Sequence, residues 1–427
     1  MHIYFSGIGG AGIGPLAQIA FQAGYQVSGS DKQASSYIDY LKTKGINNIV
    51  IGQSKKDILN IHKQQPIDWL VYSSALTLEN PDPDELRFAR DNNIKISKRD
   101  QLINQILIDN DLKLIAIAGT HGKTTTTAMV TWLFKQNAIP ISYLLPAKTT
   151  FADMGEFNPN SQYFVYEADE FDNNFLAFSP AVSLISGVSW DHHEFFPTRD
   201  AYKAAFTKFI KQSNKTFLWP EDASYLNLTK NHSLEILNDN QTKQISLKGY
   251  YNRRDGLLAI KAVKSLTNFA DNQLIKQING FPGLSRRMEE IIPGLYSDYA
   301  HTPEKIMAAI NTALEISGGK KRLVIVYEPL TDRRQHYIKQ DYGQVFDGVS
   351  KIYWLPSYLA REDKNSQILN PKDLIKYLAE PTIAEPKSKN QALKQLIKKH
   401  LKANDMVIAI AGGGGGSLDD WLRHEFN

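Results

Sequence analysis

The chain has 427 residues, of which 42% are hydrophobic and 22% charged, a composition typical of a globular protein of about three domains. Its formal net charge of +4, from 49 basic and 45 acidic residues, is too small to indicate a nucleic-acid partner. The lack of cysteine excludes disulfides, thiolate nucleophiles and cysteine metal sites. No apolar run is long enough to span a membrane and the start does not resemble a signal peptide, so we expect a cytoplasmic protein.

The first hundred residues alternate between short apolar runs and helical patterns. The predicted strands cover residues 2–6, 25–28, 49–51, 69–72 and 94–97. Helices are expected over residues 14–23 and, as a connection to the next part of the chain, over residues 100–111. This alternation predicts a doubly wound parallel sheet.

A glycine loop follows the first predicted strand directly. It reads Gly7-Ile8-Gly9-Gly10-Ala11-Gly12, and Asp31 comes at the end of the next strand. Glycines with this spacing let the backbone approach a diphosphate, and the acidic residue can hold a ribose. The pattern predicts a diphosphate ligand without deciding between NAD and a nucleotide sugar; glycines needed only for packing are the alternative.

A phosphate loop follows the apolar run at residues 114–118. It reads Gly119-Thr120-His121-Gly122-Lys123-Thr124-Thr125 and continues into a helix-compatible segment that ends at residue 134. Backbone N–H groups of such a loop and the helix dipole bind phosphate oxygens. Lys123 can reach the outer phosphates and the Thr124 hydroxyl can bind Mg²⁺. The loop is shortened, because Ile117 stands where the full pattern has glycine.

Two polar clusters follow later strands, which are predicted at residues 163–166, 182–186 and 216–219. The first begins with Glu167, a carboxylate at the end of a strand, where Mg²⁺ is commonly held. The second is Asp191-His192-His193-Glu194, in which His192 is the candidate metal ligand or proton carrier. Solvated loops are the alternative for both clusters.

In the last third of the chain, a new series of strands and helices begins after Gly280-Phe281-Pro282-Gly283, a sequence typical of a hinge. A helix is expected before it, over residues 256–266, and strands after it at 323–327, 351–355 and 406–411. The part of the chain after the hinge contains four candidates for nucleotide binding, whose types suit contacts with phosphate or ribose: Arg286, Arg287, Asp298 and His301. Surface charges without a ligand are the alternative. The lysines of residues 386–402 alternate with leucines at helical spacing and predict a solvated amphipathic helix.

In this order, the motifs resemble those of the Mur ligases of peptidoglycan synthesis. The resemblance also rests on Ser73-Ser74-Ala75, Glu167-Ala168-Asp169-Glu170 and Gly249-Tyr250-Tyr251-Asn252. It implies an α/β fold of three consecutive domains: a Rossmann-like UDP-sugar domain at 1–107, a P-loop ATPase domain at 108–283 and a Rossmann-like closing domain at 284–427. The implied partners are small molecules (ATP, Mg²⁺, UDP-N-acetylmuramate and an amino acid), with the chain a monomer or weak dimer.

The resemblance also implies roles for individual residues. Lys123, Glu167 and His192 would be catalytic, and Thr124, Glu167 and His192 would hold Mg²⁺. The phosphate loop, with Asn252 at the adenine and the four candidates after the hinge, would bind ATP. The UDP-sugar would be bound by Gly7, Gly9, Gly10, Ala11, Gly12, Asp31, Ser73 and Ser74.

The implied activity is an ATP-dependent amide ligase of the muramate-recognising branch, which forms an acyl phosphate and joins L-alanine to the sugar carboxylate. A ligase that recycles a whole tripeptide is the main alternative, followed by other ligases of this architecture, a nucleotide-binding regulator without activity and an NAD-dependent oxidoreductase. The chain departs from the family pattern at Tyr251, Asp255, Gly187, Trp190 and in the segments 327–334 and 412–416. These departures leave the amino-acid substrate open, and no carbamylated lysine is assigned.

Overall fold

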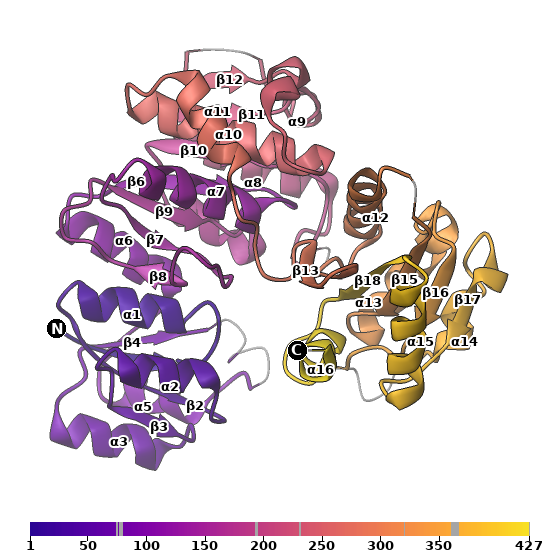
Figure 1. Ribbon diagram of the computed structural model, residues 1–427. Coiled ribbons are helices and arrows are strands. Elements are labelled where there is room, and N and C mark those ends of the chain that lie inside the picture. Colours follow the sequence, from indigo (N-terminus) through magenta and orange to yellow (C-terminus); the bar gives the residue numbers. More distant parts are fainter. Residues whose placement is uncertain are drawn as a thin grey trace. The chain divides into compact units, whose positions relative to one another are not determined.

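The computed structural model describes residues 1–73, 76, 80–192, 195–229, 232–319, 321–359 and 367–426. It contains two compact units, one made of Met1–Ser246 and Arg254–Phe281 and the other of Leu247–Arg253 and Pro282–Asn427. Three β-sheets organise the chain, two in the first unit and one in the second (Figure 1). Within these described ranges, no helix has the length and apolar character needed to cross a membrane.

The first sheet is entirely parallel, with the order β3-β2-β1-β4-β5. Its strands are β1 (His2–Ser6), β2 (Gln26–Asp31), β3 (Ile49–Ile51), β4 (Trp69–Tyr72) and β5 (Lys95–Lys98). Its helices are α1 (Gly14–Gln22), α2 (Ser36–Thr43), α3 (Lys55–Gln64), α5 (Asp84–Asp91) and α6 (Arg99–Asp109). Ile3 and Phe5 pack with α1, α2 and α6, whereas Tyr4 packs with α3 and α5 on the opposite face. The strand order reverses between β1 and β4, where open α/β sheets bind ligands.

The second sheet has the order β12-β11-β10-β6-β9-β7-β8, and only the short β7–β8 pair is antiparallel. Its strands are β6 (Lys113–Ala118), β7 (Ser142–Leu144), β8 (Gly155–Glu156), β9 (Tyr163–Glu167), β10 (Val182–Ile185), β11 (Lys215–Leu218) and β12 (Leu234–Ile236). The helical elements are α7 (Lys123–Gln136), η1 (Phe171–Ala177), α8 (Arg199–Gln212), α9 (Pro220–Tyr225), η2 (Asp239–Gln244), α10 (Tyr250–Leu266) and α11 (Asp271–Asn279). One hydrophobic core includes Ile3 and Phe5 of the first sheet and Leu114 and Ala116 of the second, so both sheets belong to one unit.

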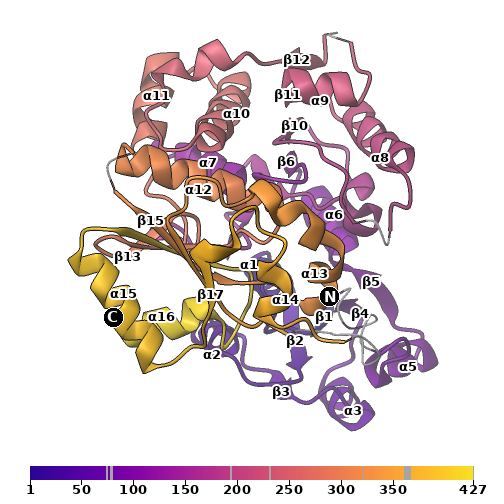
Figure 2. The ribbon, with the colours of Figure 1, turned by 90° about the vertical axis from the view of Figure 1, so that its right-hand side faces the viewer.

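The third sheet has the order β13-β14-β18-β15-β16-β17 and is parallel except for the β13–β14 hairpin. Its strands are β13 (Glu289–Ile292), β14 (Leu295–Asp298), β15 (Leu323–Glu328), β16 (Lys351–Trp354), β17 (Ala384–Pro386) and β18 (Met406–Ala411). The helical elements are α12 (Pro303–Ser317), α13 (Asp332–Ile338), η3 (Lys339–Gln344), α14 (Pro371–Ile375), η4 (Pro381–Ile383), α15 (Gln391–Lys402) and α16 (Leu418–Phe426). Separate apolar cores join α12 and α14 to one face and α15 and α16 to the other (Figure 2).

The predicted α/β fold class is confirmed, and the structure differs from the predicted elements in a few places. Strand β2 continues to Asp31 instead of ending at residue 28, because Gly29 is a close-packing position and not a turn: a Cβ there would lie 2.4 Å from the Phe5 carbonyl oxygen. Helix α10 begins at Tyr250, six residues before the predicted start. The hairpin β13–β14 was not predicted. The proposed division at residue 107 lies inside α6, and the second unit resumes at Pro282, within the predicted hinge.

Candidate active site

The phosphate loop joins β6 to α7 in the first unit and is fixed in shape by its two glycines. Gly119 (φ +140°) and Gly122 (φ +75°) both have left-handed backbone. A Cβ on Gly119 would lie 2.7 Å from Ser186 Oγ, and one on Gly122 would lie 2.7 Å from Asp255 Oδ1. Both positions therefore favour glycine, and the loop is shaped before any ligand binds. Because α7 starts at Lys123, its N-terminus adds positive potential at the loop.

Thr120 and His121 hold the loop against the segment that follows β10. The Thr120 N–H donates to the Gly187 carbonyl at 2.7 Å, and its hydroxyl donates to the Ser189 carbonyl at 2.7 Å. The same hydroxyl lies 2.8 Å from the Tyr202 hydroxyl, and His121 Nε2 lies 3.0 Å from Ser189 Oγ. Thr120, predicted to bind ATP, thus uses its donors within the protein and supports the loop.

Lys123 forms a buried ion pair with Glu170. Its Nζ donates to Glu170 Oε2 at 2.7 Å and to the Gly119 carbonyl at 2.5 Å. The Glu170 side chain is 1% exposed and that of Lys123 13%. Burial alone would lower the pKa of Lys123, but the carboxylates of Glu170, Asp169 and Glu167 outweigh burial and keep this pKa above its ordinary value. Lys123 is therefore a permanent cation at the loop.

Thr124, in the first turn of α7, contacts Glu167, the last residue of β9. The Thr124 hydroxyl donates to Glu167 Oε2 at 2.8 Å. Glu167 ends β9 and pairs in the sheet with Ile117 of β6, which brings it beside the loop. A hydroxyl and a carboxylate in contact beside a phosphate loop form the oxygen set that suits Mg²⁺.

A second group that suits a cation consists of Asp169, Glu170 and His192. One potential ligand atom from each residue lies within 4.8 Å of the others, and His192 Nε2 is 3.8 Å from Glu170 Oε1. Burial favours the neutral form of Asp169, but Lys123 and Arg99 outweigh this effect and lower the pKa of Asp169. His192 was predicted as a ligand, whereas Asp169 and Glu170 were not selected from their acidic run. His193 and Glu194 lie outside the described residues.

The predicted diphosphate loop follows β1 at the point where the strand order reverses. Gly7 has left-handed backbone (φ +83°), and the Gly9 N–H donates to Asp31 Oδ2 at 2.8 Å. Asp31 therefore anchors the loop that spans Gly7 to Gly12, including Gly10 and Ala11. Ser73 follows β4 beside the loop: a Cβ on Gly7 would lie 3.8 Å from Ser73 Cβ. Ser74 lies outside the described residues.

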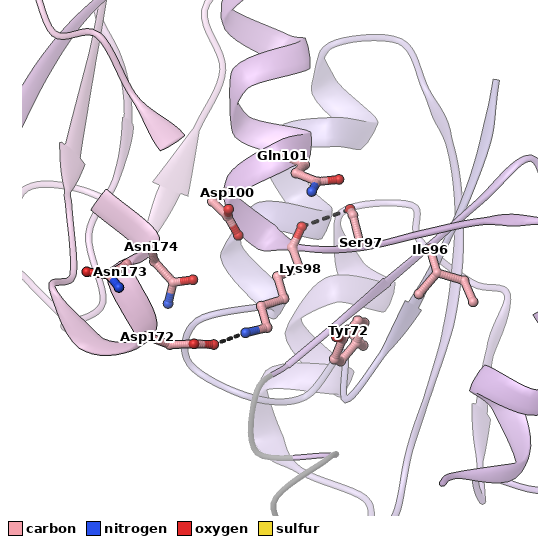
Figure 3. A pocket seen from close by; sticks show the side chains of 9 residues that line it. All are labelled: Tyr72, Ile96, Ser97, Lys98, Asp100, Gln101, Asp172, Asn173 and Asn174. Carbon is pink, nitrogen blue, oxygen red and sulfur yellow. Dashed lines mark hydrogen bonds and ion pairs between the residues drawn. The ribbon is translucent and has the colours of Figure 1, made fainter. Parts of the chain in front are cut away.

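Two adjoining cavities lie at the carboxyl ends of β4 and β5. The smaller, about 160 Å³, is lined by Gly12, Ser73, Arg99 and Asp169, and so extends from the diphosphate loop to the acidic cluster. The larger, about 340 Å³, shares Tyr72, Lys98 and Asn174 with it (Figure 3).

An ion pair crosses the larger cavity. Lys98, the last residue of β5, pairs with Asp172 of η1, and both side chains are drawn in Figure 3. Asp172 and Asn173 both have left-handed backbone, with φ of 56°. Asp and Asn tolerate this conformation better than most residues. Sequence reasoning missed these residues because their spacing matches no motif.

In the second unit, Arg286 and Arg287 both lie over the ring of Tyr299. Their guanidinium carbons are 4.6 and 5.3 Å from its centroid. Arg286 also donates to the Ala411 carbonyl at 2.6 Å. Asn252, predicted at the adenine, belongs to this unit and donates its side-chain N–H to the Lys248 carbonyl at 2.7 Å.

Asp298 and His301 shape the turn after β14. The Asp298 carboxylate accepts the N–H groups of Met288 at 2.9 Å and Ala300 at 2.8 Å. His301 Nδ1 lies 2.8 Å from the Tyr299 carbonyl and donates to it. Burial and the nearby Lys305 and Arg334 charges lower the pKa of His301 well below its ordinary value. His301 is therefore neutral near pH 7, and its Nε2 is an acceptor.

Three models of the Mur ligase family match consecutive parts of this chain. They are described as "Mur ligase family, catalytic domain" (residues 2–110), "Mur ligase middle domain" (117–265) and "Mur ligase, glutamate ligase domain" (286–413). A similar curated protein is the UDP-N-acetylmuramate--L-alanine ligase of Clostridium botulinum (strain Okra / Type B1). It is 27% identical over 452 residues, covering 96% of this chain and 95% of that protein.

Solved structures support the same fold. The UDP-N-acetylmuramate-alanine ligase of Thermotoga maritima gives a TM-score of 0.76 at 22% identity and covers 100% of this chain and 98% of its own. A murein peptide ligase from Psychrobacter arcticus 273-4 gives a TM-score of 0.64 at 21% identity, with the same coverage. The predicted family and its ligase class of activity are confirmed: the chain belongs to the Mur ligase family.

Proposed function

We propose that this chain is an ATP-dependent ligase that joins L-alanine to the carboxylate of UDP-N-acetylmuramate. The observation that carries the proposal is similarity over 96% of the chain to curated proteins with this name, combined with a complete set of phosphate-handling residues. The activity belongs to peptidoglycan precursor synthesis.

The residues fit ATP and Mg²⁺ on grounds of their own chemistry. Thr124 and Glu167 would hold one ion, since their oxygens already meet at 2.8 Å. His192 with Asp169 and Glu170 would hold a second, since their ligand atoms lie within 4.8 Å of one another. When bound, Mg²⁺ would reduce the repulsion between the phosphates and the sugar carboxylate.

The chain's own groups then account for the two chemical steps. The sugar carboxylate attacks the γ-phosphorus of ATP and ADP leaves, which gives an acyl phosphate. The neutral amine of alanine then attacks the acyl carbon, phosphate leaves, and the nitrogen loses a proton to give the amide. Lys123, held as a cation beside the loop, would stabilise the transferring phosphoryl group. For this it must turn from Glu170 toward the γ-phosphate. The glycine loop with Asp31 would anchor the uridine diphosphate at the other end of the small cavity.

The second unit carries further groups whose chemistry suits a nucleotide. Arg286 and Arg287 would meet phosphate oxygens, and neutral His301 would offer its Nε2 as an acceptor. Asp298, whose carboxylate binds two backbone N–H groups, would position this turn and not the nucleotide itself.

The test is ADP formation by the full chain with UDP-N-acetylmuramate and a panel of amine substrates. The panel contains L-alanine, glycine, L-serine and the tripeptide L-alanyl-γ-D-glutamyl-meso-diaminopimelate, and mass spectrometry identifies each product. We expect amino-acid-dependent turnover that is fastest with L-alanine. Faster turnover with the tripeptide would replace the proposal with a recycling ligase, and binding of NAD without any ligase activity would remove it.

A further inference from the structure

Arg99 connects the two ends of the small cavity. It is the first residue of α6 and follows Lys98 of β5 directly. Its Nη2 is 3.3 Å from Asp169 Oδ2. Its Nη1 lies 2.9 Å from the place where a side chain on Gly12 would begin, so the last glycine of the loop leaves room for this guanidinium. The sequence pattern alone had assigned Gly12 only to the diphosphate.

The guanidinium of Arg99 is accessible from the cavity. Arg99 is one of its lining residues, and its side chain is 25% exposed. Across the described part of the chain, its one recorded hydrogen bond runs to Asp169. A guanidinium has five N–H donors in a planar fork, so further donors remain for a ligand.

A cation is needed here because the neighbourhood is acidic. Asp169 lines the cavity, Glu167 and Glu170 lie with it near Lys123, and Lys123 is already paired with Glu170 at 2.7 Å. A ligand carboxylate that approaches the phosphate loop from the diphosphate loop would meet repulsion from these three groups. Lys98 and Arg99 are the cations in the lining of this cavity. Arg99 is already paired with Asp169, and a guanidinium can bind a second carboxylate through its other edge.

We propose that Arg99 binds the carboxylate of the acidic sugar nucleotide and makes the enzyme prefer it over an uncharged sugar nucleotide. This proposal rests on the proposed function, since it assigns a group within that substrate. Arg99 would orient the nucleophilic oxygen toward the γ-phosphate while Asp169 holds the far edge of the guanidinium. Lys98 suits this role less well, because its ammonium is paired with Asp172 across the larger cavity and lacks the second edge of a planar guanidinium (Figure 3).

The test compares two ligands that differ in the carboxylate. UDP-N-acetylglucosamine has the same uridine diphosphate and acetamido sugar as UDP-N-acetylmuramate but lacks the lactyl carboxylate. Dissociation constants for both are measured by calorimetry on the full-length wild type, Arg99→Gln and Arg99→Lys. We expect the wild type to prefer the acidic ligand by at least roughly tenfold, the value of one charge-assisted hydrogen bond. Arg99→Gln should abolish this preference, and Arg99→Lys, which keeps the charge without the fork, should retain part of it.

Arg87→Gln is the matched control, because Arg87 is an exposed arginine of α5 paired with Asp84. It should leave both dissociation constants unchanged. An equal loss of affinity for both ligands in the Arg99 variants would overturn the proposal and assign Arg99 to the diphosphate. An unchanged preference in Arg99→Gln, or, should that variant not fold, in Arg99→Lys, would also overturn it. Failure of the wild type to bind UDP-N-acetylmuramate would count against the proposed function itself.

Discussion

Replacing Lys123 should impair folding as well as catalysis, because Lys123 is the counterion of a buried carboxylate. Lys123→Met removes the charge that lies 2.7 Å from Glu170 Oε2 and leaves a glutamate side chain that is 1% exposed. The Tyr202 hydroxyl at 3.4 Å and His192 Nε2 at 3.8 Å would remain near Glu170 Oε1. Removing one partner of a buried ion pair typically costs about 3–5 kcal/mol, so we expect the free energy of unfolding to fall by that amount.

The double variant Lys123→Met/Glu170→Gln separates the two roles. It has no unpaired buried charge, so its free energy of unfolding should return to within about 1–2 kcal/mol of the wild type. Its turnover should stay low, since loss of one transition-state cation typically costs roughly 10²–10³ in kcat. Urea unfolding and ADP formation are measured for the single and double variants.

Lys135→Met provides the control in the same helix. Lys135 pairs with Glu156 at 2.8 Å, but the two side chains are 28% and 32% exposed. Its loss should cost no more than about 1 kcal/mol and leave turnover unchanged. The reasoning would be refuted if Lys123→Met were as stable as the wild type, if the double variant were no more stable than the single one, or if either kept wild-type turnover.

Two further predictions follow from the same unit. Glu167→Ala should raise the Mg-ATP dissociation constant at least roughly tenfold. His192→Ala should leave this constant within about threefold of the wild type and should act mainly by lowering kcat. Calorimetry and turnover of folded variants check both effects, and wild-type turnover of His192→Ala would exclude the second-ion role. Asp222, which accepts the Val188 N–H at 2.8 Å, has its pKa raised by burial to about 7. A raised pKa means stability that is present below the unfolded pKa and lost as pH rises through about 7. Asp222→Asn should therefore be more stable than the wild type by about 4 kcal/mol at about pH 8 but only about 1 kcal/mol at about pH 4.5, and equal gains in urea unfolding at both pH values would contradict it.

The phosphate loop could be predicted because its information is local. The motif lies in one short stretch of sequence: an apolar strand, two glycines that shape the loop, and Lys123-Thr124, which suit phosphate and Mg²⁺. The same holds for the glycine loop after β1. The strands at the centre of each sheet were predicted from apolar runs, because central parallel strands are buried on both faces.

The remainder of the site depends on contacts between distant residues. The spacing of Glu167, Asp169 and Glu170 does not tell which of them is buried. In the structure Glu170 is buried beside Tyr202 of α8 and pairs with Lys123. Thr120 was assigned to ATP, yet its partner Tyr202 lies 82 residues away in the chain. Arg99 was missed because a single arginine at a helix start matches no motif.

Three contacts of the site, two ion pairs and one hydrogen bond, follow the same pattern. In each contact, a side chain that suits phosphate, metal or carboxylate binds one of the acids of residues 167–170. The contacts are Lys123 with Glu170, Thr124 with Glu167 and Arg99 with Asp169. Each group that would receive substrate is thus held in place by an internal carboxylate, and two of these three carboxylates are paired with a cation without ligand. Ligands would then exchange partners within a preformed network instead of ordering free side chains, which lowers the entropy cost of binding. The same arrangement explains why substitution of one member should lower both stability and activity. Loss of a half-buried pair such as Lys135 with Glu156 should cost no more than about 1 kcal/mol and leave activity unchanged.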